Sequence, residues 1–211
     1  MKTKTAPARQ VRTGLLFSVT CLLLSACSLP QAQPDPTRFY ILSTPAVAAP
    51  VAPAATAPVI HLRAIELASY IKAKPMIVRR GDNEIEFREF ARWGEPLELG
   101  IARVLREELL ARGVASAVLA GGLRAVDTTY NYELVVRILA CEGVAGGAVN
   151  FRAAWELSTT GDTPKITAQG EYHPTDLKWD GKNEATLAAQ ISQAVTGLAG
   201  EIAAGLAQPG K

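Results

Sequence analysis

The sequence has very few of the residues that usually carry catalysis, metal binding or crosslinks. Of its 211 residues, two are histidine and three are cysteine. Neither His61 nor His173 has a second ligand at the spacing of a metal site, and the chain contains no C-x-x-C pair. It also lacks the G-x-S-x-G motif of hydrolases and the phosphate-binding G-x-x-x-x-G-K-[ST] motif. We therefore expect a protein that is not an enzyme and that needs no metal or cofactor.

The first 26 residues have the pattern of a secretory signal peptide. Four basic residues precede an uncharged run over residues 13–26 that is rich in Leu, Phe and Val. This run is too short to span a membrane, which takes about 20 apolar residues. It ends in Leu24-Ser25-Ala26-Cys27, which resembles the bacterial lipobox. We expect cleavage before Cys27, diacylglycerol on its thiol and a fatty acid such as palmitate on its new amino group; the alternative is an ordinary signal peptide.

Neither sign of charge dominates the chain that follows. Without the four basic residues of the signal, 18 Lys and Arg face 20 Asp and Glu, with no basic cluster. Binding to nucleic acid needs a positive surface, so nucleic acid is excluded as a partner. Cys21 leaves with the signal and Cys27 carries lipid, so Cys141 has no partner for an intrachain disulfide. Its apolar neighbours predict a small buried hydrophobe.

Composition divides the mature chain into a tether and one domain. Residues 27–37 contain Pro, Gln and Asp and form a lipidated tether, which spans about 30 Å at roughly 3.1 Å per residue. Residues 38–207 are long enough for one domain with a hydrophobic core. Within it, residues 43–58 consist almost wholly of Ala, Val and Pro, which predicts an exposed loop, because each proline removes a backbone donor.

The first half of the domain mixes strands with one helix. Residues 39–42 and 59–67 are β-prone, and the second run is expected to place His61, Arg63, Ile65 and Leu67 on one face. Residues 76–80 and 84–87 flank a Gly-Asp-Asn turn and predict a hairpin. A proline in the first turn opens a helix that a glycine ends at residue 113, and residues 114–119 predict another strand.

The second half predicts an antiparallel meander and a long helix. Three runs, 132–140, 149–158 and 166–172, alternate in polarity with a period of two, so one face of the meander should be buried. A helix over residues 183–206 carries one apolar stripe and a side with little charge. That side packs on the sheet or meets another subunit. The predicted fold class is α/β, with one mixed sheet and helices packed on it as a two-layer or three-layer sandwich.

Several short motifs occur in a fixed order along the domain: Phe39-Tyr40-x-Leu42, Pro75-x-Ile77-Val78-x-Arg80, Asn83-x-Ile85, Glu89-Phe90 and Arg92-Trp93-x-Glu95-Pro96-Leu97. Together they resemble the ABC-type transport auxiliary lipoprotein family (PqiC-like proteins). The resemblance covers residues 38–205 and is most specific over 69–105, where Lys72 and Lys74 depart from the acidic residues expected near Pro75. The long Ala/Pro insert is a second departure.

The resemblance implies a non-catalytic lipoprotein of the outer membrane that supports membrane integrity. Its partners would be an MCE-domain protein and an ABC transporter that move lipid between the two membranes, and a homo-oligomer would suit a docking role. Ser28 follows the acylated cysteine where an aspartate would favour retention in the inner membrane, so the outer membrane is expected, with inner-membrane anchoring left open. The alternative is a lipoprotein that itself carries a lipid, which needs an apolar pocket of about 300 Å³ or more.

Four residues within the motifs are candidates for contact with a partner. Trp93 either locks the hairpin to the following helix as a buried aromatic or anchors a partner, since tryptophan is enriched at binding hot spots. Arg79, Arg80 and Arg92 are either solvated charges on strands or ligands of a partner or lipid phosphate.

Overall fold

The computed structural model describes residues 33–44, 51–120 and 129–207. The chain divides into two units, Met1–Pro36 and Thr37–Lys211, and the described part of the first unit contains no helix or strand. Cys27 and the signal lie outside the described residues, as does part of the Ala/Pro-rich loop. The second unit contains β1 (Arg38–Tyr40), β2 (Val59–Leu62), β3 (Glu66–Leu67), the 3-10 helix η1 (Ser69–Lys72), β4 (Pro75–Gly81), β5 (Glu84–Trp93), α2 (Leu97–Ala111), β6 (Ala117–Ala120), β7 (Tyr132–Val144), β8 (Val149–Thr159), β9 (Ile166–Tyr172) and α3 (Glu184–Ala207).

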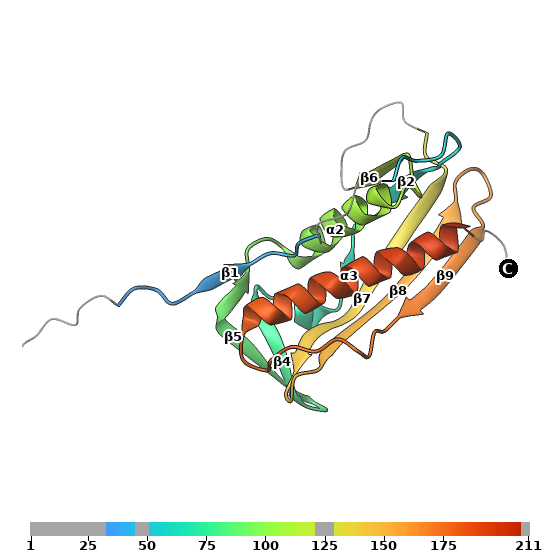
Figure 1. The fold of residues 1–211 in the computed structure, drawn as a ribbon. Coiled ribbons are helices and arrows are strands. Elements are labelled where there is room, and N and C mark those ends of the chain that lie inside the picture. Colours follow the sequence, from blue (N-terminus) through green and yellow to red (C-terminus); the bar gives the residue numbers. More distant parts are fainter. Residues whose placement is uncertain (1–32, 45–50, 121–128, 208–211) are drawn as a thin grey trace, which may run out of the picture. The chain divides into compact units, whose positions relative to one another are not determined.

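The described strands form one mixed sheet built around β7, which confirms the predicted fold class (Figure 1). One edge of β7 pairs in parallel with β2, β3 and β4 in succession. Its other edge pairs along nearly its whole length with β8, and β9 follows antiparallel, as the meander predicts. The antiparallel hairpin β4–β5 carries β1 as a parallel edge strand, while β6 lies beyond β2 at another edge.

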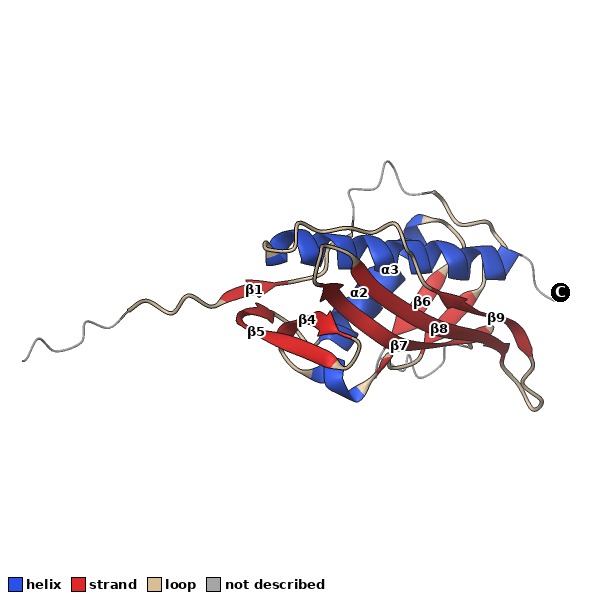
Figure 2. Ribbon diagram, turned by 90° about the horizontal axis from the view of Figure 1, so that it is seen from below, coloured by secondary structure: helices blue, strands red, loops and turns tan. Residues whose placement is uncertain are grey.

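Both helices lie on the same face of the sheet, so the domain has two layers (Figure 2). The apolar stripe of α2 is wholly buried at Ile101, Val104 and Leu105, and that of α3 at Leu187 and Leu198. Burying one such side chain stabilises a fold by about 1.5–3 kcal/mol, and these stripes join the inward residues of β7 and β8 in one continuous core. Both predicted helices are confirmed to within a few residues at their ends.

The predicted continuous strand over residues 59–67 is wrong, because the chain breaks between β2 and β3. Arg63 still donates its backbone N–H to Leu134 O at 3.0 Å, but pairing resumes only at Glu66, which faces Arg137. One extra residue therefore lies in the connection, and the buried positions change parity from Leu62 to Ile65. Arg63 and Ile65 consequently do not share the face that strict alternation predicts.

A similar irregularity changes the faces of β7. The pairing with β8 shifts between Ile138 and Ala140, so Leu139 is an extra residue and is 40% exposed. Beyond it, Cys141 rather than Ala140 faces the helices, opposite the buried Phe151. Cys141 is 4% exposed, which confirms the predicted buried hydrophobe, and burial raises the pKa of its thiol to about 12.

Small residues of α3 make room for aromatic side chains of its own sheet. A Cβ on Gly197 would overlap the hydroxyl of Tyr172, and one on Gly205 would lie 2.5 Å from Cη2 of Trp155. Part of the charge-poor side of α3 therefore packs on the sheet, which was one of the two expectations for it. Its outward part, which includes Ala185, Ala189 and Gln193, is exposed.

Candidate functional site

The predicted arginines do not gather in one place. Arg79 and Arg80 are neighbours on β4 and point to opposite faces of the hairpin. Arg92 lies seven residues along β5 from Ile85, the pairing partner of Arg79, which is roughly 20 Å at about 3.3 Å per residue. The three arginines therefore cannot bind one small ligand together.

Arg79 is held by a buried carboxylate. Its Nε donates to Glu142 Oε1 on β7 at 2.5 Å, and its Nη1 donates to the backbone oxygen of Asp82 at 2.9 Å. The side chain of Glu142 is 0% exposed and also accepts a hydrogen bond from Asn150 at 2.8 Å. The hydrogen bond to Glu142 raises the pKa of Arg79, so the guanidinium stays charged. Arg79 thus joins the β4–β5 hairpin to β7 and β8.

Tyr70 of η1 joins this cluster on the face of the sheet opposite α2 and α3. Burial, reinforced by hydrogen bonding and charge from Glu142, raises the pKa of Tyr70 to about 12, so the phenol stays protonated. Glu142 Oε2 is buried with no hydrogen-bond partner among the described residues. Glu142 lies beyond the predicted run 132–140 and was not singled out from the sequence, because only the pairing of β4 with β7 brings Arg79 beside it.

Arg80 belongs to a chain of opposite charges that ends at α3. It pairs with Glu86, and Glu86 pairs with Arg88 at 2.8 Å. Arg88 then reaches Glu184 at 2.7 Å, in the first turn of α3, where a carboxylate is favoured by the helix dipole. These hydrogen bonds, from Arg88 first and then Arg80, lower the pKa of Glu86. The sequence analysis missed this network, since Arg88 and Glu184 are 96 positions apart.

Trp93 and Arg92 lie at the end of β5, beside β1. Trp93 is 6% exposed and belongs to the core, so of its two expected positions it has the buried one. Its backbone N–H donates to Lys74 O at 2.8 Å. Arg92 is half-buried, faces Phe39 across the strand pair, and donates from Nε to Glu89 O at 2.9 Å. A partner at this end of the sheet would meet Arg92 and Phe39 rather than the indole of Trp93.

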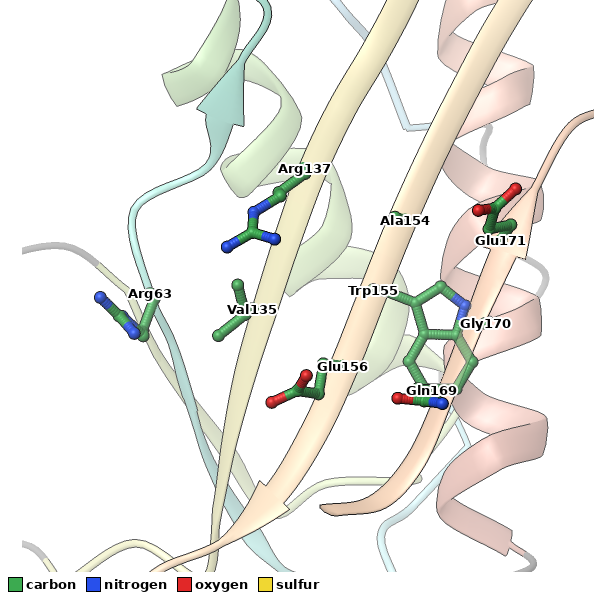
Figure 3. A pocket seen from close by; sticks show the side chains of 9 residues that line it. All are labelled: Arg63, Val135, Arg137, Ala154, Trp155, Glu156, Gln169, Gly170 and Glu171. Carbon is green, nitrogen blue, oxygen red and sulfur yellow. The ribbon is translucent and has the colours of Figure 1, made fainter.

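On the face opposite α2 and α3, strands β7, β8 and β9 form a polar hollow of about 500 Å³ (Figure 3). Its charged rim contains arginines and glutamates, so it has no strong net sign. Arg63 and Arg137 are already paired, with Glu133 at 3.2 Å and Glu66 at 2.7 Å. The lining contains two carboxylates, Glu156 and Glu171, and no histidine, cysteine or serine. It is formed by Arg63, Val135, Arg137, Ala154, Trp155, Glu156, Gln169, Gly170 and Glu171.

A second hollow is apolar and lies between α2 and the strand edge at β6. It measures about 460 Å³ and is floored by small and aliphatic side chains, including Ala102, Val118 and Leu119. Leu99, which lines it, is 58% exposed, so the hollow is an open groove rather than a closed cavity. Arg103 and Arg106 stand at its rim, and we call it the α2 groove.

The described residues contain no cluster of three or more His, Cys, Asp or Glu side chains that could hold a metal ion. Within the same parts of the chain, no helix is both long and apolar enough to cross a bilayer.

Comparison with known proteins places the chain among transport lipoproteins. The family model for the ABC-type transport auxiliary lipoprotein component matches residues 40–203. An uncharacterised crystallised protein aligns at 14% identity over 80% of this chain and 97% of its own, with a TM-score of 0.63. A Xanthomonas campestris protein aligns at 17% identity over 79% of this chain and 93% of its own, again with a TM-score of 0.63. These likenesses support the fold, and no curated protein matches the sequence.

Proposed function

This chain belongs to the ABC-type transport auxiliary lipoprotein family, and we propose that it docks a periplasmic MCE/ABC-type lipid-transport assembly to the outer membrane and so supports membrane integrity. The observation that carries the proposal is the extent of the family match. Residues 40–203 include every described element from β2 to β9 and most of α3, so the match covers the fold rather than a single motif.

The proposed anchor is lipid on Cys27, followed by a tether of ten residues before Arg38. A single acyl chain gives marginal binding, whereas two or more hold a protein on a membrane stably. With Ser28 beside the acylated cysteine, we assign the lipidated chain to the periplasmic face of the outer membrane. The partners in this proposal are an MCE-domain protein and an ABC transporter, with further copies of this chain as an additional partner.

The features of the domain suit a non-catalytic role. The charges on the β4–β5 hairpin are arranged in pairs that connect elements to one another, and the polar hollow of β7–β9 contains no histidine, cysteine or serine beside its two glutamates, Glu156 and Glu171. Two exposed surfaces that a partner can reach are the hairpin around Arg80 and the outward side of α3 around Ala189 and Gln193.

In-cell photo-crosslinking tests this proposal. A photoreactive amino acid is placed at Arg80 or at Ala189, both exposed, and the crosslinked material is identified by mass spectrometry. A probe at the buried Val104 is the matched control and should stay within the chain. Crosslinks to an MCE-domain protein or to a second copy support docking. Crosslinks to phospholipid alone from both exposed positions contradict it.

The α2 groove supports a second candidate function, in which the protein carries a lipid. Its volume exceeds the roughly 300 Å³ expected for a small-molecule site, and Arg106 at the rim suits an anionic head group, whereas Arg103 is already paired with Glu95 at 2.6 Å. The observation against a dedicated carrier is that the groove is open. Ala102→Phe should fill it, while Ala189→Phe, on the exposed side of α3, leaves it unchanged. Phospholipid that co-purifies with the parent and the control but not with Ala102→Phe would favour the carrier.

A further inference from the structure

Three of the most exposed large apolar side chains lie together at one edge of the sheet. Phe39 is 66% exposed, Ile41 is 61% exposed and Phe90 is 57% exposed. Phe39 pairs with Arg92, and the exposed Phe90 alternates with the buried Ala91 and Trp93, so Phe90 lies on the outward face that Phe39 shares. A Cβ on Gly94 would be 3.2 Å from Ile41 and 3.7 Å from Phe39, so both side chains flank Gly94. We call Phe39, Ile41 and Phe90 the edge patch.

The edge patch is held in place on both sides and is not a frayed end. Before Ile41, the Gly94 N–H donates to Tyr40 O at 2.7 Å. After it, Leu42 is 1% exposed, its backbone oxygen accepts a hydrogen bond from Arg103 at 2.8 Å, and the Ser43 N–H donates to Ser192 on α3 at 3.1 Å. The exposed side chains are therefore presented by a backbone that is fixed to α2, α3 and β5.

The position of the edge patch in the chain indicates what covers it. Phe39 is the twelfth residue after Cys27, and ten residues separate Cys27 from Arg38, the first residue of β1. At about 3.1 Å per residue, the tether spans roughly 30 Å, so a lipid on Cys27 keeps this edge close to a bilayer. Every encounter of the edge patch with that bilayer is then intramolecular, which raises its effective concentration strongly.

We propose that the edge patch is a membrane-docking surface, which inserts into the boundary between head groups and acyl chains of the bilayer that holds Cys27. This inference rests on the lipidation of Cys27 in the proposed function. Arg38 is exposed and Arg92 is half-buried beside Phe39, and their guanidinium groups match the phosphates of the head groups. Aromatic and aliphatic side chains with cationic neighbours are the composition of interfacial anchors. Docking here turns the β1–β5 edge toward the membrane.

The test uses the mature lipidated chain reconstituted in vesicles of phosphatidylethanolamine and phosphatidylglycerol. An environment-sensitive fluorophore is attached to Ile41→Cys, and quenching by nitroxide-bearing phospholipid is measured. The matched control is Ile166→Cys on β9, at the opposite edge of the sheet and 55% exposed. Cys141 is buried and an acylated Cys27 has no free thiol, so the label is specific.

Docking predicts a blue shift and strong quenching at position 41 and neither at position 166. The double substitution Phe39→Ser, Phe90→Ser should abolish the quenching at position 41 while the protein stays in the vesicle fraction. If the protein carries the acyl mass but both positions show equal, water-like emission, the proposal that the edge patch docks on the membrane is overturned. The lipid anchor on Cys27 is then still supported. A shift that disappears when the protein is diluted in lipid shows contact with a second copy and also overturns it. If the chain carries no acyl mass, Cys27 is not lipidated, and the proposal of membrane docking is overturned together with the anchor on which it rests.

Discussion

Arg79 and Glu142 form an ion pair at 2.5 Å between β4 and β7, and the carboxylate in it is completely buried. The parallel pairing of these strands includes only Val78 with Gly143 and Arg79 with Val144, so few backbone hydrogen bonds connect the hairpin to the central strand. The side-chain pair therefore carries part of a junction that the backbone alone makes weakly.

Removing the arginine should destabilise the domain far more than removing its neighbour. Arg79→Ala leaves a buried carboxylate that keeps its hydrogen bond from Asn150 but has lost its cationic partner, and breaking a buried pair in this way costs about 3–5 kcal/mol. Arg80→Ala removes an exposed pair worth about 0–1 kcal/mol. Urea denaturation of both variants measures the difference, and equal midpoints would show that Glu142 is not buried in solution.

Two glycines of α3 should respond in opposite directions to alanine. Gly197→Ala forces a methyl group against Tyr172, with Cζ at 2.8 Å, and overpacking of this kind costs about 1–3 kcal/mol. Gly200→Ala meets only Arg112 at 3.5 Å and gains about 1 kcal/mol of helix propensity. Thermal unfolding of the two variants tests the packing of α3 on β9. A stabilised Gly197→Ala protein would contradict that packing.

Acid should weaken the connection between the hairpin and α3. The pKa of Glu86 is lowered from 4.5, chiefly by hydrogen bonds from Arg88 and then Arg80. Its stabilising contribution is therefore fully present above about pH 4.5 and is lost as the pH falls through the lower folded-state pKa. Glu86→Gln should flatten the fall in stability between about pH 5 and pH 3, as measured by urea denaturation at several pH values.

The control for that measurement is Glu89→Gln, an exposed glutamate on the same strand. If both substitutions change the pH dependence equally, the contacts of Glu86 with Arg80 and Arg88 do not contribute to stability in solution.

The thiol of Cys141 should be inert in the folded protein. Burial raises its pKa to about 12 and leaves 4% of the residue exposed, so neither thiolate nor access is available at neutral pH. N-ethylmaleimide should add no mass to the native lipidated chain and one adduct in denaturing urea, which mass spectrometry resolves. Rapid labelling of the native protein would show that Cys141 is accessible, which contradicts the register of β7 described above.

Local patterns in the sequence were sufficient to predict most elements but not their faces. The alternation of residues 149–158 and the stripes of both helices predict β8, α2 and α3 with ends shifted by only a few residues. The prediction of which side chains share a face was wrong at Arg63–Ile65 and at Leu139, because one extra residue enters the strand pairing at each place. The alternation of polar and apolar residues cannot show such an extra residue, because the pairing partner on the neighbouring strand decides where it occurs.

Of the candidate functional features, some were predictable from the sequence and others depend on the tertiary structure. The sequence alone predicted the acylation motif at Cys27 and a family that the comparison then matched over residues 40–203, because these signals lie in consecutive residues. Only the tertiary structure decided which arginines are free. Arg79 pairs with Glu142, 63 positions away, and Arg88 pairs with Glu184, 96 positions away. Whether an arginine is already ion-paired therefore depends on residues that only folding brings close to it. The edge patch likewise exists because β1 pairs with β5, which places Phe39 and Phe90 on one face of the sheet.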